Sequence, residues 1–99
     1  MSLQFEWDEE KANANIKKHG IPFETAAKVF LDENRIEIYD KEHSIKEDRY
    51  ITIGMANDVL FVVYTERYPK TRLISARLAT AKERPTIKSQ AEKQKNKNN

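Results

Sequence analysis

The second half of the chain contains four strand-like runs, and the connections between them are too short to hold crossover helices. The runs cover residues 35–40, 49–55, 59–67 and 71–78. Residues 35–40 and 49–55 alternate apolar and polar side chains, whereas residues 59–67 are apolar on both faces, which is typical of a central strand. Asn57-Asp58 and Tyr68-Pro69-Lys70 are turn sequences. Strands joined by so few residues must pair antiparallel, so the pattern predicts a four-stranded antiparallel meander.

Two helices are expected before this sheet. Asp8 is a suitable N-cap for a helix that ends at Gly20, with Trp7, Ala12 and Ile16 spaced to cover one face. A second helix runs from Pro22 or Phe23 to Leu31. Its apolar residues follow the i, i+3, i+4, i+7, i+8 pattern, and they are Phe23, Ala26, Ala27, Phe30 and Leu31. The chain is therefore predicted to form an α+β fold with both helices on one face of the sheet.

The chain has 99 residues and no cysteine, which indicates one domain and excludes a disulfide scaffold. We expect this domain to cover residues 1–85. Thr80 and Glu83 can form a capping box for a brief helix that Pro85 limits to about one turn. Residues 86–99 are basic and polar, and we expect them to be disordered. The longest apolar run is far shorter than a membrane span, and no leader is recognisable, so we expect a cytoplasmic protein that does not contact membranes.

Positive charge collects late in the chain. Between positions 67 and 84 a single acid, Glu83, accompanies six bases, which are Arg67, Lys70, Arg72, Arg77, Lys82 and Arg84. A hairpin with Arg67 opposite Thr71 would place Thr65 opposite Leu73 and Phe61 opposite Arg77. Strand alternation then puts Thr65, Arg67, Ser75 and Arg77 on one face, and Ile74, Ala76 and Leu78 on the face toward the helices. Arginines on an open sheet face can bind a phosphodiester, although a simple solvated surface explains the charge as well.

Two histidines can carry chemistry. His43 lies in a loop where neither helix nor strand formation explains it, and it can act as a general acid or base. His19 can be explained as a residue that ends a helix. Tyr64 is more typical of a core position. No metal-binding or nucleotide-binding motif is present, so we expect no metal and no cofactor.

Several stretches together resemble one family. They are Phe5-Glu6-Trp7-Asp8, Lys11, Asn15, Lys18-His19-Gly20, Val29-Phe30-Leu31-Asp32, residues 40–43, Glu47-Asp48-Arg49-Tyr50, Gly54, residues 62–67, Ile74-Ser75-Ala76-Arg77, Ala79-Thr80 and Glu83-Arg84. In this order and spacing, over residues 5–84, they resemble the BrnT ribonuclease toxins. The resemblance implies a RelE-like fold and RNA cleavage that inhibits translation. It also implies a cognate antitoxin with a ribbon-helix-helix region, a complex of two toxins with two antitoxins, and contact with operator DNA only through the antitoxin.

The resemblance and the charge pattern together give a set of expected site residues. The expected catalytic residues are Arg67, Arg77, His43, Arg49 and Glu83, and the expected RNA-binding residues are Lys11, His19, Tyr64, Arg72 and Arg84. Arg67 and Arg77 would stabilise the phosphorane with support from Arg49, while His43, or else Glu83, transfers the proton. Such a reaction leaves a 2′,3′-cyclic phosphate and needs no metal.

One departure from the family pattern leaves an alternative open. Family members usually continue past the Glu-Arg pair with a helix that carries a tyrosine, whereas here Pro85 follows and no tyrosine comes after it. The alternative is a degenerate toxin with weak or no activity, which binds nucleic acid or protein through the same arginine face.

Overall fold

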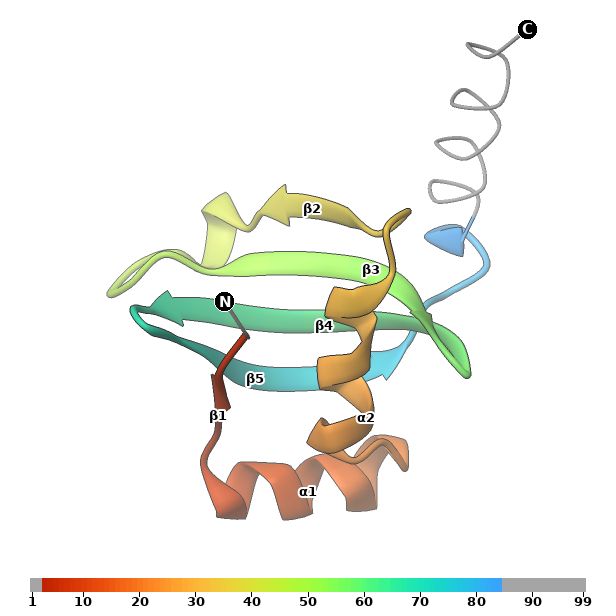
Figure 1. The fold of residues 1–99 in the computed structure, drawn as a ribbon, viewed down its shortest axis with the longest axis horizontal. Coiled ribbons are helices and arrows are strands. Elements are labelled where there is room, and N and C mark those ends of the chain that lie inside the picture. Colours follow the sequence, from red (N-terminus) through yellow and green to blue (C-terminus); the bar gives the residue numbers. More distant parts are fainter. Residues whose placement is uncertain (1–2, 85–99) are drawn as a thin grey trace, which may run out of the picture.

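The four predicted strands form the expected meander, and a short fifth strand extends it. The computed structural model describes residues 3–84. Its strands are β1 (Phe5–Glu6), β2 (Ile36–Tyr39), β3 (Tyr50–Ala56), β4 (Asp58–Arg67) and β5 (Lys70–Leu78). Neighbours from β2 to β5 pair antiparallel, and the sheet order is β1-β5-β4-β3-β2 (Figure 1). The four-strand meander is confirmed.

The prediction of a purely antiparallel sheet of four strands was wrong, because β1 pairs in parallel with β5. Its partners are Phe5 with Thr71 and Glu6 with Arg72, and the amide of Thr71 also donates to the carbonyl of Gln4 at 2.8 Å. Two residues are too few to show an alternating pattern, so the sequence indicates only an extended entry there. The sheet is therefore mixed and has five strands.

Helix α1 (Glu9–His19) begins and ends as its caps predict. Asp8 accepts from the amides of Glu10 and Lys11, and Gly20 adopts the left-handed conformation with φ of 72°. The expected inward face was partly wrong, because Ile16 is 44% exposed while Asn15 is 6% exposed. Helix α1 lies along the outer side of β5 (Figure 1), where Asn15 hydrogen-bonds to the main chain of that strand.

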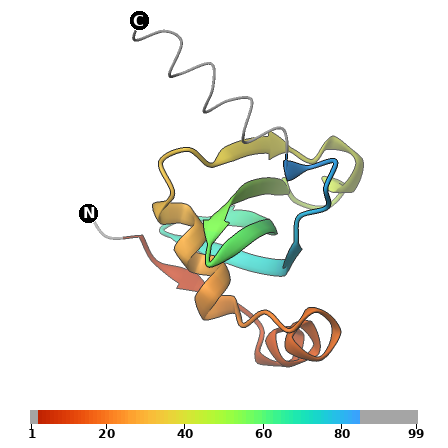
Figure 2. The same ribbon diagram turned by 90° about the vertical axis from the view of Figure 1, so that its right-hand side faces the viewer.

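The second predicted helix is present as α2 (Phe23–Ala27) followed by a 3₁₀ turn, η1 (Lys28–Leu31). Phe23, Ala26 and Val29 are fully buried at intervals of three residues. A 3₁₀ turn has about three residues per turn, which moves Val29 into the core and leaves Leu31, expected to be inside, 76% exposed. Figure 2 shows α2 on one side of the sheet and the segment after β5 on the other.

A β-bulge divides the β4–β5 pairing into two registers. From Leu60 to Val63 the pairing is the predicted one, with Phe61 opposite Arg77. Beyond a shift at Val63/Tyr64, Tyr64 pairs with Leu73 and Thr65 pairs with Arg72. The expectation that Leu73 faces Thr65 was therefore wrong, and Leu73 replaces Ile74 on the side toward the helices. A bulge sets two residues of one strand against one of the other.

The sheet consequently has two unlike faces. The helix face packs against α2 and η1, with Ala12 of α1 in the same core, and its buried residues include Leu60, Val62, Tyr64, Leu73 and Ala76. We call the opposite side the open face. The open face has half-buried apolar side chains at its centre, including Ile51, Phe61 and Val63. Residues 85–99, where the disordered tail was expected, lie outside the described residues. Within residues 3–84 no helix is long and apolar enough to cross a membrane.

Candidate functional site

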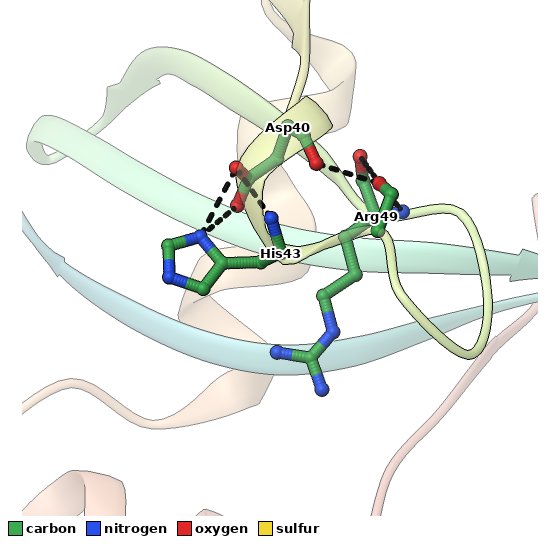
Figure 3. Close-up of polar contacts among 4 residues, drawn as sticks. Asp40, His43 and Arg49 are labelled. Carbon is green, nitrogen blue, oxygen red and sulfur yellow. Dashed lines mark hydrogen bonds and ion pairs between the residues drawn. The ribbon is translucent and has the colours of Figure 1, made fainter.

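The connection between β2 and β3 is a loop held by its own hydrogen bonds. Asp40 caps the 3₁₀ turn η2 (Lys41–His43), and its amide donates to the carbonyl of Arg49 at 2.9 Å. The hydroxyl of Ser44 donates to the carbonyl of Asp40 at 2.6 Å and accepts from the amide of Arg49 at 2.8 Å. These bonds fix His43 and Arg49 relative to each other at the end of the sheet (Figure 3).

Asp40 and His43 form a hydrogen-bonded pair within this loop. The Nδ1 atom of His43 lies 3.1 and 3.0 Å from the two carboxylate oxygens of Asp40. The Asp40 side chain is 14% exposed and that of His43 is 62% exposed. A carboxylate at Nδ1 holds the proton on that nitrogen, which leaves the lone pair of Nε2 directed outward. This arrangement suits a general base that faces solvent.

A surface hollow of about 390 Å³ adjoins the imidazole. It is lined by His43, Ile45, Lys46, Glu47 and Arg49. Figure 3 shows the imidazole of His43 and the guanidinium of Arg49 on the same side of the loop. Arg49 precedes Tyr50, so strand alternation directs its side chain to the open face. A proton acceptor and two cations thus border one open hollow.

Further arginines lie at this end of the open face. Arg67 is at the end of β4, where its guanidinium is 3.3 Å from Glu47 and half exposed. Arg72 is opposite Thr65 and pairs with Glu6 of β1 at 3.0 Å. Thr65 is buried, and its hydroxyl donates to the carbonyl of Asp48 at 2.6 Å. The structure therefore brings His43, Arg49, Arg67 and Arg72 to one end of the sheet.

Arg77 lies at the other end of the open face. It is opposite Phe61, six positions along β4 from Arg67, and six residues of strand span about 20 Å. Both arginines do lie on the predicted face, but they are too far apart to bind the same phosphate. The expectation that they act together on one phosphorane was wrong, because strand alternation fixes the face of a residue and not its position along the strand.

The guanidinium of Arg77 is also occupied. It donates two hydrogen bonds of 2.9 Å to Glu83 and lies 3.8 Å above the centre of the Phe61 ring. The hydrogen bond from Arg77 lowers the pKa of Glu83 to about 2. Glu83 is therefore ionised at neutral pH and has no proton to donate. The predicted capping box is present, since Glu83 accepts from the amide of Thr80 at 2.7 Å.

The remaining expected residues lie apart from the hollow. Lys11 and His19 are on α1, and Arg84 is exposed beyond β5. Tyr64 is 2% exposed and its hydroxyl donates to Glu37. Burial, followed by that hydrogen bond, raises the pKa of Tyr64 well above its ordinary value, so the ring stays neutral.

Sequence reasoning missed Asp40 as a partner of His43. The available signal is an acid three residues before a histidine at the start of a turn, where one carboxylate can cap the turn and also reach the imidazole. Among residues 3–84 no three His, Cys, Asp or Glu side chains are grouped as a metal site requires.

Comparisons with known proteins agree with this fold. Residues 7–83 match the family model described as ribonuclease toxin, BrnT, of type II toxin-antitoxin system. A search of curated proteins gave no match. The 1.1 Å crystal structure of the Brucella abortus ribonuclease toxin BrnT superposes with a TM-score of 0.60 at 28% identity, covering 80% of this chain and 99% of that one. The chain therefore belongs to the BrnT family of ribonuclease toxins of type II toxin–antitoxin systems.

Proposed function

We propose that this toxin cleaves RNA at the hollow beside His43 and thereby inhibits translation. The observation that supports this most strongly is the Asp40–His43 pair, with Arg49 on the same side of the loop. It supplies an oriented proton acceptor and a cation, two of the groups that metal-free transphosphorylation requires, while water protonates the leaving oxygen.

In the proposed reaction Nε2 of His43 removes the proton of a ribose 2′-hydroxyl. The 2′-oxygen attacks the adjacent phosphorus, the bond from phosphorus to the 5′-oxygen breaks, and that oxygen takes a proton from water. The products are a 2′,3′-cyclic phosphate and a 5′-hydroxyl. Asp40 stabilises the imidazolium that forms, and Arg49 stabilises the charge on the phosphorane. Arg67 and Arg72 bind phosphates beyond the cleaved one. To do so, Arg67 releases Glu47 and Arg72 releases Glu6, and each pairs with a phosphate of the RNA instead.

Membership of a type II toxin family implies a cognate antitoxin. We propose that this partner carries a ribbon-helix-helix region and neutralises the toxin in a complex of two copies of each. The complex would contact operator DNA only through the antitoxin.

The test is cleavage of an RNA oligonucleotide in the presence of EDTA, with analysis of the product ends. We expect His43→Ala to lower the rate by about 10²–10⁴-fold, the usual contribution of a general base. Asp40→Asn keeps a capping side chain and should lower the rate at least about tenfold through the misoriented imidazole. Glu42→Ala, an exposed position in the same turn, is the control and should cleave at the unaltered rate.

Two outcomes would count against the proposal. Cleavage that persists in His43→Ala at the same folded concentration removes the histidine from the reaction. Salt-sensitive RNA binding with no cleavage by the unaltered protein supports the alternative, a degenerate toxin that only binds.

A further inference from the structure

Aromatic rings form a continuous row across the helix face of the sheet. Ring centroids are 5.6 Å apart between Tyr39 and Tyr50 and again between Tyr50 and Tyr64. The row continues from Tyr64 to Phe30 at 4.9 Å and from Phe30 to Phe5 at 5.1 Å. It therefore starts in the core and ends at the edge strand β2, beside the loop that carries Asp40 and His43.

The outer end of this row is open to solvent. Tyr64 is 2% exposed, whereas Tyr39 is 50% exposed. Burial of apolar surface explains Tyr64 but not a half-exposed ring at the end of a strand. The hydroxyl of Tyr39 donates to Asp48 at 2.8 Å, and its ring packs edge-on against Tyr50. Tyr39 is thus held in one orientation with a free surface, so binding a flat ligand to it costs little ordering entropy.

The row ends where the RNA would be cleaved. Tyr39 directly precedes Asp40, the residue that orients His43. Tyr50 follows Arg49, and the two side chains lie on opposite faces of the sheet. A phosphate at His43 and Arg49 would lie on one side of the loop, with Tyr39 and Tyr50 on the other side. A single strand crossing the end of β2 would reach both.

The polar groups around the rings are acceptors. Asp48 accepts from Tyr39, and Glu37 accepts from Tyr64 and from Arg35. Asp48 and Glu37 are exposed, so each has acceptor capacity for a further donor. Carboxylates accept hydrogen bonds from the amino groups of bases and repel phosphates. These carboxylates therefore favour a nucleobase at this position over the phosphate backbone of RNA.

We propose that Tyr39 and Tyr50 form a stacking site for a nucleobase that neighbours the cleaved phosphate, with a preference for amino-bearing bases over uracil. The inference rests on the proposed RNA cleavage and adds a specificity site to it. Stacking on aromatic side chains is a general way to bind unpaired bases.

The experiment measures binding without cleavage. The probe is a 2′-O-methyl RNA oligonucleotide that contains 2-aminopurine, whose fluorescence falls when the base stacks and whose blocked 2′-oxygens prevent reaction. We expect quenching by the unaltered toxin, and weaker binding by Tyr39→Ala by about 5- to 150-fold with loss of quenching. Tyr39→Phe keeps the ring and should keep the quenching. Tyr68→Ala, which removes a 94% exposed tyrosine at the β4–β5 turn, is the matched control and should behave as the unaltered protein.

The outcomes separate this site from the cleavage proposal. Unchanged quenching and affinity in Tyr39→Ala overturns the stacking site while leaving His43 in place. Absence of RNA binding by every variant overturns both. If Tyr39→Ala binds RNA normally but binds the antitoxin poorly, the tyrosines are a protein contact and the stacking site is wrong.

Discussion

The side-chain amide of Asn15 pairs with both main-chain groups of Ala76. Nδ2 of Asn15 donates to the carbonyl of Ala76 at 2.9 Å, and Oδ1 accepts from the amide of Ala76 at 3.1 Å. Within residues 3–84, strand β1 covers the outer side of β5 only at positions 71 and 72, and no described strand pairs with Ala76 on that side. Asn15 takes the place of a strand there and also donates to the carbonyl of Ile21 at 2.9 Å. One helix side chain therefore closes the open edge of the sheet.

Replacing Asn15 with alanine should be strongly destabilising. The change leaves the amide and carbonyl of Ala76 and the carbonyl of Ile21 buried without these partners. A buried unsatisfied polar group costs about 1–3 kcal/mol, so we expect the free energy of unfolding to fall by at least about 2 kcal/mol. Urea unfolding monitored by circular dichroism measures this free energy. Asn13→Ala, exposed on the same helix, is the control, and equal stability of the two variants would contradict the role of Asn15.

Gly54 should tolerate no side chain, because η1 and the turn after it lie directly against β3. A Cβ atom at Gly54 would be 2.8 Å from Cβ of Arg35 and from Cγ1 of Val29. Overpacking of this kind costs about 1–3 kcal/mol, so Gly54→Ala should lower the midpoint of thermal unfolding. Met55→Ala, at the exposed next position, serves as the control. A midpoint for Gly54→Ala equal to that of the control would show that the segment moves away at no cost.

The Arg77–Glu83 ion pair should make stability depend on acid pH. The hydrogen bond from Arg77 lowers the pKa of Glu83 from its ordinary value of 4.5 to about 2. A carboxylate whose pKa is lowered by folding contributes its full stabilisation at pH values above its pKa in the unfolded chain. This stabilisation is lost as the pH falls through its pKa in the folded protein. The stability difference between the unaltered protein and Glu83→Gln should therefore be constant near pH 7 and shrink between pH 4.5 and about 2. Urea midpoints across this range test it, and a difference independent of pH would refute it.

Alanine substitutions of Arg49 and Arg77 should affect the rate of RNA cleavage differently, because the two residues lie at opposite ends of the sheet. Arg49 borders the hollow beside His43, and removal of one charge-stabilising donor costs about 10²–10³ in rate. Arg77 lies at the other end of the sheet and is engaged by Glu83. We expect Arg49→Ala to lose most activity and Arg77→Ala to lose little at equal folded concentration. A larger loss of activity in Arg77→Ala than in Arg49→Ala would instead place the reaction near Phe61.

Local signals in the sequence were sufficient for most of the fold. Asp8 and Gly20 mark the ends of α1, and alternation, one continuous apolar run and the turn sequences locate the four long strands. Two features depend on contacts between distant segments. Strand β1 is defined only by pairing with Thr71 and Arg72, and the bulge near Ile74 arises because two stretches of β5 pair with β4 in different registers. No local pattern encodes either feature.

The sequence predicted which kinds of residue form the candidate site, but not which of them lie close together. The loop position of His43 indicated chemistry, and strand alternation placed Arg67 and Arg77 on the open face. Their separation, the pairing of Arg77 with Glu83, and the support of His43 by Asp40 depend on side-chain geometry that spacing does not determine. The expected RNA-binding roles of Lys11, His19 and Arg84 stay predictions.

The bulge in β5 determines which charges RNA meets. Because β5 contributes one extra residue near Ile74, Leu73 points into the core and Arg72 joins the cationic end of the sheet. Deleting Ile74 would merge the two registers and leave every other residue of β5 on its present face. If the strand kept Ile74 but paired in one continuous register, Ile74 would face the core, Leu73 would face Thr65 on the open face, and Arg72 would turn to the helix face. An alignment of this chain with a relative that has one residue fewer in β5 should therefore place the gap at Ile74.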